Sequence, residues 1–398
     1  MKRTVAGGLV AVGMSGISMA QTNAPQATSQ PPPAAPKTWV DSVAFKGDLR
    51  YRYESINDDS KLDSKKDTYN RERERIRARL SAEAKCNDNL KAGIGLSTGQ
   101  SDPVSGNQTL GDGASKKEIK LDTAFFDYNF LGDNPNEVHA IAGKMNNPFI
   151  TQPDDLIWDP DFRPEGIAAR SQFGGGFATL FANAGYMWVQ ERATGDNDDS
   201  KLYAGQGALK LQFVPEVALT IGASYYGFDN MKGYDVIDWE GKNNAYGNST
   251  QKGTVSGGTT NKAWATDFTP VVYFAQLDVW VAGLPVAVFG QQLSNSDGKK
   301  FDNGQMYGVS LGKAKNPGTF ELGYSYAKVE KDATLGMWTD SDRWGGGTDG
   351  KGHKLSGKYQ IMKNLQAGVT YFVDKKTISD SAKEKDYDRL QVDLVASF

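Results

Sequence analysis

Cysteine and histidine are almost absent from this chain. Its 398 residues include one Cys and two His. A single cysteine excludes a disulfide bond within the chain and any cysteine-rich metal site. Two histidines offer little from which to build a histidine-based metal or catalytic cluster. We therefore expect neither a metal ion nor a cofactor.

An excess of charge of either sign is also missing. The chain has 45 basic and 48 acidic residues, which gives a formal net charge of -3 at pH 7. A nearly balanced, slightly acidic chain lacks the basic surface on which nucleic-acid binding depends. We expect no nucleic-acid partner.

Long hydrophobic runs are missing beyond the first twenty residues. A membrane-spanning helix needs about 20 consecutive apolar residues, and no later window offers them, so a bundle of membrane helices is excluded. The chain is nevertheless rich in Gly (45) and in aromatic residues (18 Phe, 17 Tyr and 8 Trp). That many aromatic residues argue against a disordered chain and suit strands whose apolar residues recur with a period of two.

The N-terminus has the pattern of a secretory leader. Lys2 and Arg3 precede a short apolar run, and the small residues Ser18 and Ala20 mark a cleavage site. A stretch rich in Pro and Gln follows, which is typical of a flexible linker. The predicted division is a signal peptide at 1–20, a linker at 21–37 and a structured region at 38–398.

Alternation of apolar and polar residues dominates the remaining chain. In one segment Ile76, Ala78, Leu80, Ala82 and Ala84 share a face, and the residues between them are charged or polar. A soluble sheet could turn these faces to a core and to water, whereas a transmembrane barrel turns them to lipid and to a wet lumen. The predicted strands are 43–56, 69–86, 90–101, 117–131, 137–145, 165–173, 177–192, 200–214, 217–229, 264–282, 285–295, 303–314, 318–331, 351–361, 364–376 and 384–398.

The connections between these segments alternate between short and long. This arrangement is typical of an outer-membrane barrel with tight periplasmic turns and long external loops. The last strand ends in Phe398 after alternating apolar residues, which resembles the signal that outer-membrane assembly machinery reads. We therefore predict an all-β fold, a transmembrane antiparallel β-barrel of about sixteen strands.

Four sequence motifs within residues 117–192 resemble the putative porin family of Gram-negative bacteria. They are LDTAFFDY at 121–128, GKMNNPF at 143–149, WDPDFRPEG at 158–166 and FANAGY at 181–186. The resemblance implies a passive, water-filled channel in the outer membrane. It also implies a homotrimer and a third external loop that folds into the pore.

The stretch 146–164 follows the fifth predicted strand and so matches that third loop. It is rich in carboxylates, and these make a candidate constriction loop: Asp154, Asp155, Asp159, Asp161 and, just after it, Glu165. Fixed carboxylates in a narrow passage would create a field that sorts ions. An ordinary exposed acidic loop and a Ca²⁺ site remain alternatives.

A ladder of arginines occupies the second predicted strand. Residues two apart share one strand face, so all five should point into the lumen, together with basic residues of the first and last strands. The predicted basic wall comprises Lys46, Arg50, Arg52, Arg71, Arg73, Arg75, Arg77, Arg79 and Arg389. The alternative is a lumen face that is merely polar and is neutralised locally by Glu54, Glu83 and Asp393.

The sequence thus predicts an outer-membrane porin that lets small hydrophilic solutes and ions diffuse through an aqueous pore. Its partners would be those solutes, outer-membrane lipid and lipopolysaccharide. We expect no enzymatic activity, because the chain has no Gly-x-Ser-x-Gly motif and its two histidines lie far apart. The alternatives are a substrate-specific channel for an organic acid, phosphate or sugar, a barrel enzyme, and a secreted adhesin.

Overall fold

The computed structural model describes residues 42–398 except 63–67, 193–197, 238, 240–243 and 256–257. The predicted signal peptide and linker lie outside the described residues. The described part consists of β-strands, loops and short 3-10 turns, without an α-helix. Across these same residues, no helix has the length and apolarity needed to cross a membrane.

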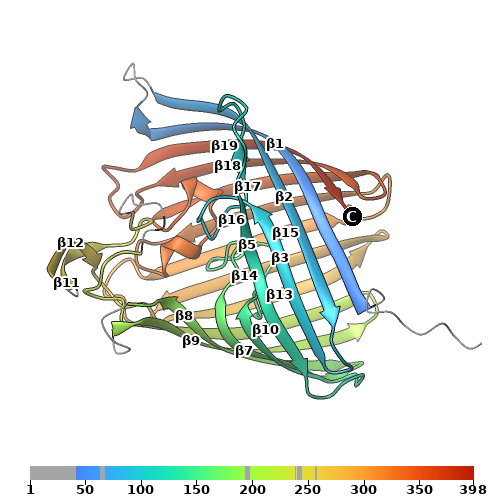
Figure 1. Cartoon of the computed structure of the whole chain (residues 1–398). Helices are drawn as coiled ribbons and strands as arrows, with labels where there is room; N and C mark the ends of the chain where they lie inside the picture. The colour runs from blue at the N-terminus through green and yellow to red at the C-terminus, as the bar shows by residue number, and fades with distance from the viewer. Residues whose placement is uncertain (1–41, 63–67, 193–197, 238, 240–243, 256–257) are drawn as a thin grey trace, which may run out of the picture. The chain divides into compact units, whose positions relative to one another are not determined.

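One sheet closes on itself as an antiparallel barrel (Figure 1). Its wall has sixteen strands, and β1 pairs with β2 on one side and with β19 on the other. The wall strands are β1 (Val43–Leu62), β2 (Thr68–Lys85), β3 (Leu90–Thr98), β5 (Ile119–Asn129), β6 (Glu137–Lys144), β7 (Glu165–Gly175), β8 (Ala178–Gln190), β9 (Ser200–Val214), β10 (Val217–Asp229), β13 (Pro270–Val281), β14 (Leu284–Asn295), β15 (Asn303–Gly312), β16 (Phe320–Val329), β17 (Gly350–Met362), β18 (Leu365–Lys376) and β19 (Lys385–Ser397).

Three short strands lie outside this wall. The two-residue β4 (Gln108–Thr109) pairs with β2 from a loop, and β11 (Thr250–Val255) pairs with β12 (Gly258–Trp264) in a separate two-stranded sheet. The sixteen-stranded barrel is confirmed, but the predicted strand 264–282 begins too early. Trp264 belongs to β12 and is fully buried, so its apolar character reflects packing within a loop.

The alternation along β1 and β2 separates an outer from an inner face. On β2, Leu80 of the outer face is 47% exposed, whereas Arg77 of the inner face is 8% exposed. Leu49 and Tyr51 are likewise exposed on the outside. Apolar side chains directed outward and charged ones directed inward suit a wall between lipid and an aqueous lumen.

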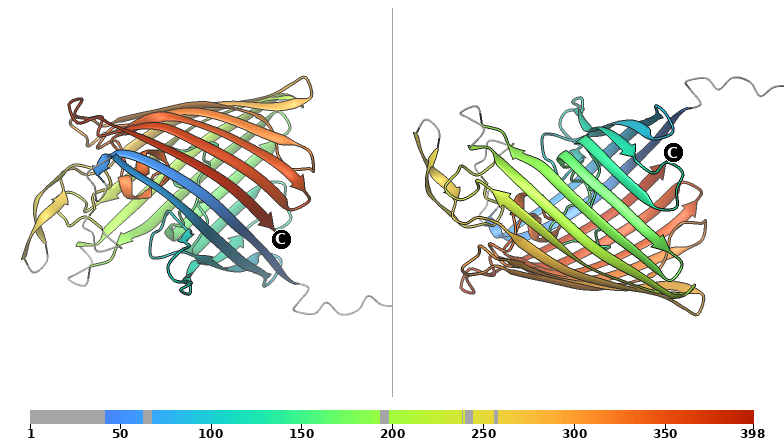
Figure 2. Two further views of the ribbon diagram at one scale, coloured as in Figure 1. Left: turned by 90° about the horizontal axis from the view of Figure 1, so that it is seen from above. Right: turned by 90° about the horizontal axis from the view of Figure 1, so that it is seen from below.

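The connections differ in length at the two ends of the barrel (Figure 2). At one end tight turns join neighbouring strands; between β13 and β14 the turn uses Ala282 and Gly283, both with positive φ (50° and 81°). Two such residues form the turn whose twist matches a β-hairpin. At the other end lie long connections, including the β11–β12 sheet.

Phe398 takes part in closing the barrel, so its deletion should lower the yield of folded protein. Its backbone exchanges two hydrogen bonds with Gly47 of β1, at 2.9 and 3.0 Å. Without them the end of β19 loses part of its pairing with β1. We expect a clear fall in the heat-modifiable form of the protein in membranes, measured by gel mobility. Phe398→Tyr, which keeps the backbone and the ring, is the control, and wild-type yield of the truncated chain would contradict the prediction.

Candidate functional site

The loop between β6 and β7 crosses the interior of the barrel. The amide of Ile150 donates to Gln206 of β9 at 2.7 Å, and the amide of Leu156 donates to Gln291 of β14 at 3.0 Å. Farther along, Asp161 accepts hydrogen bonds from arginines of β2. These strands lie in distant parts of the wall, so the predicted third loop is folded into the barrel.

An aromatic core fixes this loop against the β10 side of the wall. Trp158 donates its indole N–H to the hydroxyl of Tyr226 at 3.2 Å, and its ring stacks on Phe162 with the centroids 5.3 Å apart. Phe149 and Trp338 pack against the same rings. All of these side chains are buried. These apolar rings pack together on the β10 side of the interior.

A second loop, between β16 and β17, also folds inward. Its Trp338 carbonyl accepts a hydrogen bond from the amide of Asp159 at 2.8 Å, and the amide of Ser341 donates to the Asp159 carboxylate at 2.8 Å. The 3-10 turns η3 (Gly336–Trp338) and η4 (Arg343–Gly345) lie in this loop. Its sequence pattern is only that of a long polar connection. Its tryptophans were the signal that it is packed inside.

Asp154 anchors the third loop to the far wall. It accepts hydrogen bonds from Ser325 of β16 and from Lys354 of β17, the latter at 2.5 Å, and it lies 3.3 Å from Arg343 of the second loop. Burial by itself would raise the pKa of the Asp154 carboxyl, but Lys354 and Arg343 outweigh it and hold this pKa below its ordinary value. Asp154 is therefore an ionised anchor.

The Asp155 carboxylate accepts hydrogen bonds mainly from backbone amides of its own loop. It accepts from the amides of Ile157 and Trp158 at 2.9 and 3.0 Å and from the side chain of Gln291 at 2.9 Å. Burial nevertheless raises the pKa of the Asp155 carboxyl. These bonds shape the loop where it turns, as expected for a carboxylate that caps backbone amides.

Asp159 and Asp161 lie close together, but their pKa values are shifted in opposite directions. Burial, followed by the charges of Asp340 and Asp161, raises the pKa of Asp159 well above its ordinary value. Burial also disfavours the charged form of Asp161, but Arg77 and Arg79 outweigh that cost and lower the pKa of Asp161. Asp161 therefore contributes a firm negative charge, and Asp159 a charge that responds to pH.

Most residues of the predicted basic wall are paired with carboxylates. Arg73, Arg75 and Arg389 converge on Glu54, whose side chain is 0% exposed. Elsewhere on the wall, Arg52 donates two hydrogen bonds to Asp393 and lies 3.3 Å from Asp342 of the second loop. Arg77 and Arg79 both form ion pairs with Asp48 and with Asp161.

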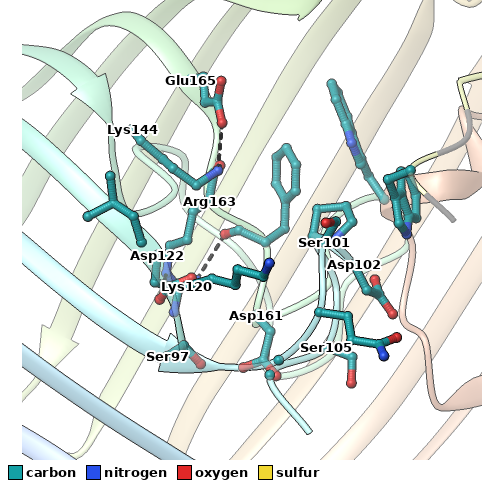
Figure 3. Close-up of a pocket in the computed structure, with 18 of the residues that line it drawn as sticks. Ser97, Ser101, Asp102, Ser105, Lys120, Asp122, Lys144, Asp161, Arg163 and Glu165 are labelled. Carbon is teal, nitrogen blue, oxygen red and sulfur yellow. Dashed lines mark hydrogen bonds and ion pairs between the residues drawn. The ribbon is translucent and has the colours of Figure 1, made fainter. Parts of the chain in front are cut away.

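Three of the predicted site residues lie apart from this network. Arg71 is exposed near the long-loop end, and Lys46 is 4.0 Å from Glu83 with most of its side chain exposed. Glu165 points toward Lys144, at 2.8 Å, beside a cavity of about 520 Å³ (Figure 3). These residues border the lumen without reaching its centre.

Three further cavities share lining residues, and each includes arginines of β1 or β2, although the inner one is lined mainly by β15–β19. The outer one, of about 450 Å³, is lined by Arg71, Arg73, Arg75 and Arg389, and the inner one, of about 390 Å³, by Arg50, Arg52 and Lys354. Asp342 lines both and also the middle cavity of about 430 Å³. In the middle cavity Arg50, Arg77, Arg79 and Arg163 accompany Asp159, Asp161, Asp340 and Asp342.

Comparisons with known proteins agree with this architecture. OprB of Pseudomonas putida, in a structure at high pH, superposes with a TM-score of 0.57 at 12% identity, covering 90% of this chain and 94% of that one. DcaP of Acinetobacter baumannii (TM-score 0.48, 13% identity, 89% and 97% covered) and a loop-deletion mutant of OmpT from Vibrio cholerae (0.49, 13%, 89% and 99%) are less similar. The OprB likeness supports the fold.

The family comparison covers most of the sequence. No curated protein matches the chain. The family model described as putative porin matches residues 19–260 and 286–398, which include the barrel strands that carry the arginine wall and both inward loops. The chain belongs to the family of putative porins and is an outer-membrane channel protein.

Proposed function

We propose that the protein is a porin through which small hydrophilic solutes and ions diffuse passively, and that they cross along the β1–β2 wall. The observation that carries this proposal is the series of three cavities joined by shared lining residues, with Asp342 common to all three. The aromatic core fills the opposite side of the interior, so this series offers the aqueous route. The proposal requires no chemical reaction.

The middle cavity is the proposed constriction. Arginines of β1 and β2 face carboxylates of the two inward loops across it, and such facing charges create a transverse field that orients polar solutes. Asp159 and Asp161 keep the role expected from the sequence, and Asp340 and Asp342 of the second loop join them. Asp154 and Asp155 act as anchors that hold the third loop in position.

Ion selectivity follows from the balance of these charges, which is close to even. We expect weak anion preference or near neutrality, and a shift toward cations for Arg79→Gln, because Asp48 and Asp161 then lose one shared cation. A unit charge ~7 Å from a permeating ion in water is worth about 0.6 kcal/mol, roughly a factor of three in relative permeability. Reversal potentials of the purified protein in planar bilayers under a salt gradient measure this ratio.

A matched control uses the same change elsewhere on the inner face. Lys91→Gln removes a positive charge near the short-turn end of β3, away from the middle cavity, and should leave the reversal potential unchanged. Equal shifts of the reversal potential in both variants would mean that the middle cavity is not the constriction. Absence of any channel conductance would refute the porin proposal itself.

The cellular setting follows from the same proposal. We propose that the leader is removed after Ala20, that the apolar outer face contacts outer-membrane lipid and lipopolysaccharide, and that three chains assemble as the family resemblance implies. Sequencing the N-terminus of the membrane-extracted protein tests the first point. Sedimentation in detergent distinguishes a trimer from a monomer.

A further inference from the structure

Arg50 differs from its neighbours on the inner wall because its guanidinium is held by a neutral group. Its Nη2 donates to the side-chain oxygen of Asn107 at 2.7 Å. Asn107 is oriented in turn by Ser105, with its side-chain nitrogen 3.2 Å from the Ser105 hydroxyl. The described residues place no carboxylate within ion-pairing distance of Arg50. An amide partner fixes the position of the guanidinium without adding a negative charge of its own.

Arg50 lies directly opposite a second arginine. In the register between β1 and β2 its Cα partner is Arg77, and both side chains are on the inner face. Like charges directly opposite one another across two strands are destabilising. Arg77 is compensated by its ion pairs with Asp48 and Asp161, whereas Arg50 has an amide partner, so a further anion is favoured beside Arg50.

Within the described part of the chain, Arg50 and Arg77 each have a hydrogen-bond donor without a partner. The Nε–H groups of Arg50 and Arg77 are both buried, and neither has an acceptor among the described residues. Arg77 is 8% exposed as a whole. Both arginines line the middle and the inner cavities, so a solute in the passage can approach the Arg50 guanidinium, although the buried Nε–H groups themselves lie out of its reach.

The local charge balance indicates which anion fits. Arg50, Arg77 and Arg79 have two carboxylates in ion pairs among them, Asp48 and Asp161, so one positive charge is in excess. The opposite side of the middle cavity carries Asp159, Asp340 and Asp342 in addition. A single negative charge compensates the excess, whereas a second one would meet those carboxylates.

We propose that Arg50 forms a binding subsite for the carboxylate group of small monoanionic solutes that pass through the pore. A guanidinium matches the planar geometry of a carboxylate and gives charge-assisted hydrogen bonds to it. The subsite deepens the proposed porin function and rests on it. It makes the channel saturable for monocarboxylates, in contrast to chloride, which is a single spherical atom and cannot match two parallel N–H donors with two separate oxygens.

The test uses the full-length protein in planar bilayers with sodium acetate as the probe. Single-channel conductance should level off as the acetate concentration rises, and Arg50→Gln should raise the half-saturating concentration by about tenfold, the loss expected for one charge-assisted hydrogen bond. Lys91→Gln is the control and should leave half-saturation unchanged. Conductance that rises in proportion to acetate, or equal half-saturation in Arg50→Gln and the wild type, would overturn the subsite.

A second variant separates the subsite from any effect on folding. Asn107→Asp keeps an oxygen acceptor for Arg50 but adds the charge that is missing, so it should abolish saturation by acetate while conductance in chloride persists. Retained saturation in Asn107→Asp would overturn the role of the excess charge.

Sulfate tests the preference for one negative charge. At equal ionic strength it should compete with acetate more weakly than formate does, and stronger competition by sulfate would refute the assignment to monoanions. A protein without any conductance would instead refute the porin function, so the two failures are distinguishable.

Discussion

Glu54→Gln is expected to destabilise the folded barrel by about 3–5 kcal/mol, the cost typical of removing one partner from a buried ion pair. Glu54 is fully buried on β1, and three arginines converge on it from β2 and β19. Glutamine keeps the size of the side chain but removes the charge. Arg73, Arg75 and Arg389 would then repel one another at the seam where the barrel closes.

Urea-induced unfolding in detergent, followed by tryptophan fluorescence and by gel mobility, measures this loss. Glu321→Gln is a matched control because Glu321 also pairs on the inner face, with Lys358 at 2.7 Å, but both side chains are partly exposed. An exposed pair is worth at most about 1 kcal/mol. If the two variants lose the same stability, Glu54 does not hold the network together.

The wall of the barrel could be predicted from the sequence because strand alternation is a local signal. A side chain's face follows from the parity of its position, which placed the five ladder arginines of β2 on one inner face without knowledge of their partners. An inward third loop was expected from the family resemblance, and its place after the fifth strand and its carboxylates identified the segment. Trp264 shows the limit of the local signal, because burial inside a loop imitates an apolar strand position.

The second inward loop could not be found in the same way. Whether a long loop folds into a barrel depends on what it meets there, and Trp338 meets rings of the third loop that lie about 180 residues earlier in the chain. The carboxylates that neutralise the arginines also depend on contacts between distant parts of the chain. Asp342 reaches Arg52 and Arg389 from this loop, so a count of charges along the strands overstated how basic the wall is.

Acidic pH should act first on two carboxyls of the proposed constriction. Burial, aided by neighbouring carboxylates, raises the pKa of Asp159, and burial and Asp342 raise the pKa of Asp340 despite the opposing effect of Lys354. Asp342 behaves oppositely, since Arg389 and Arg52 outweigh its burial and lower its pKa. The charged groups around these carboxyls are Arg50, Arg77, Arg79, Arg163, Arg343, Lys354, Asp154, Asp161 and Asp342.

As the pH falls from neutral toward about 4, the ordinary pKa of an aspartate, Asp159 and Asp340 should therefore take up protons while Asp161 and Asp342 stay ionised. The arginines keep their charge throughout, so the passage becomes more positive and the channel should shift toward anions, by roughly a factor of three in relative permeability for each charge lost. Reversal potentials measured across this pH range test the shift.

Asp340→Asn is the informative variant. Its side-chain oxygen can still accept the hydrogen bond from the Asp342 amide, which is 2.8 Å long, but the side chain no longer gains or loses a proton. This variant should show a smaller pH-dependent shift than the wild type. A shift toward cations on acidification, or an undiminished shift in Asp340→Asn, would mean that groups other than these two carboxyls set the charge of the passage.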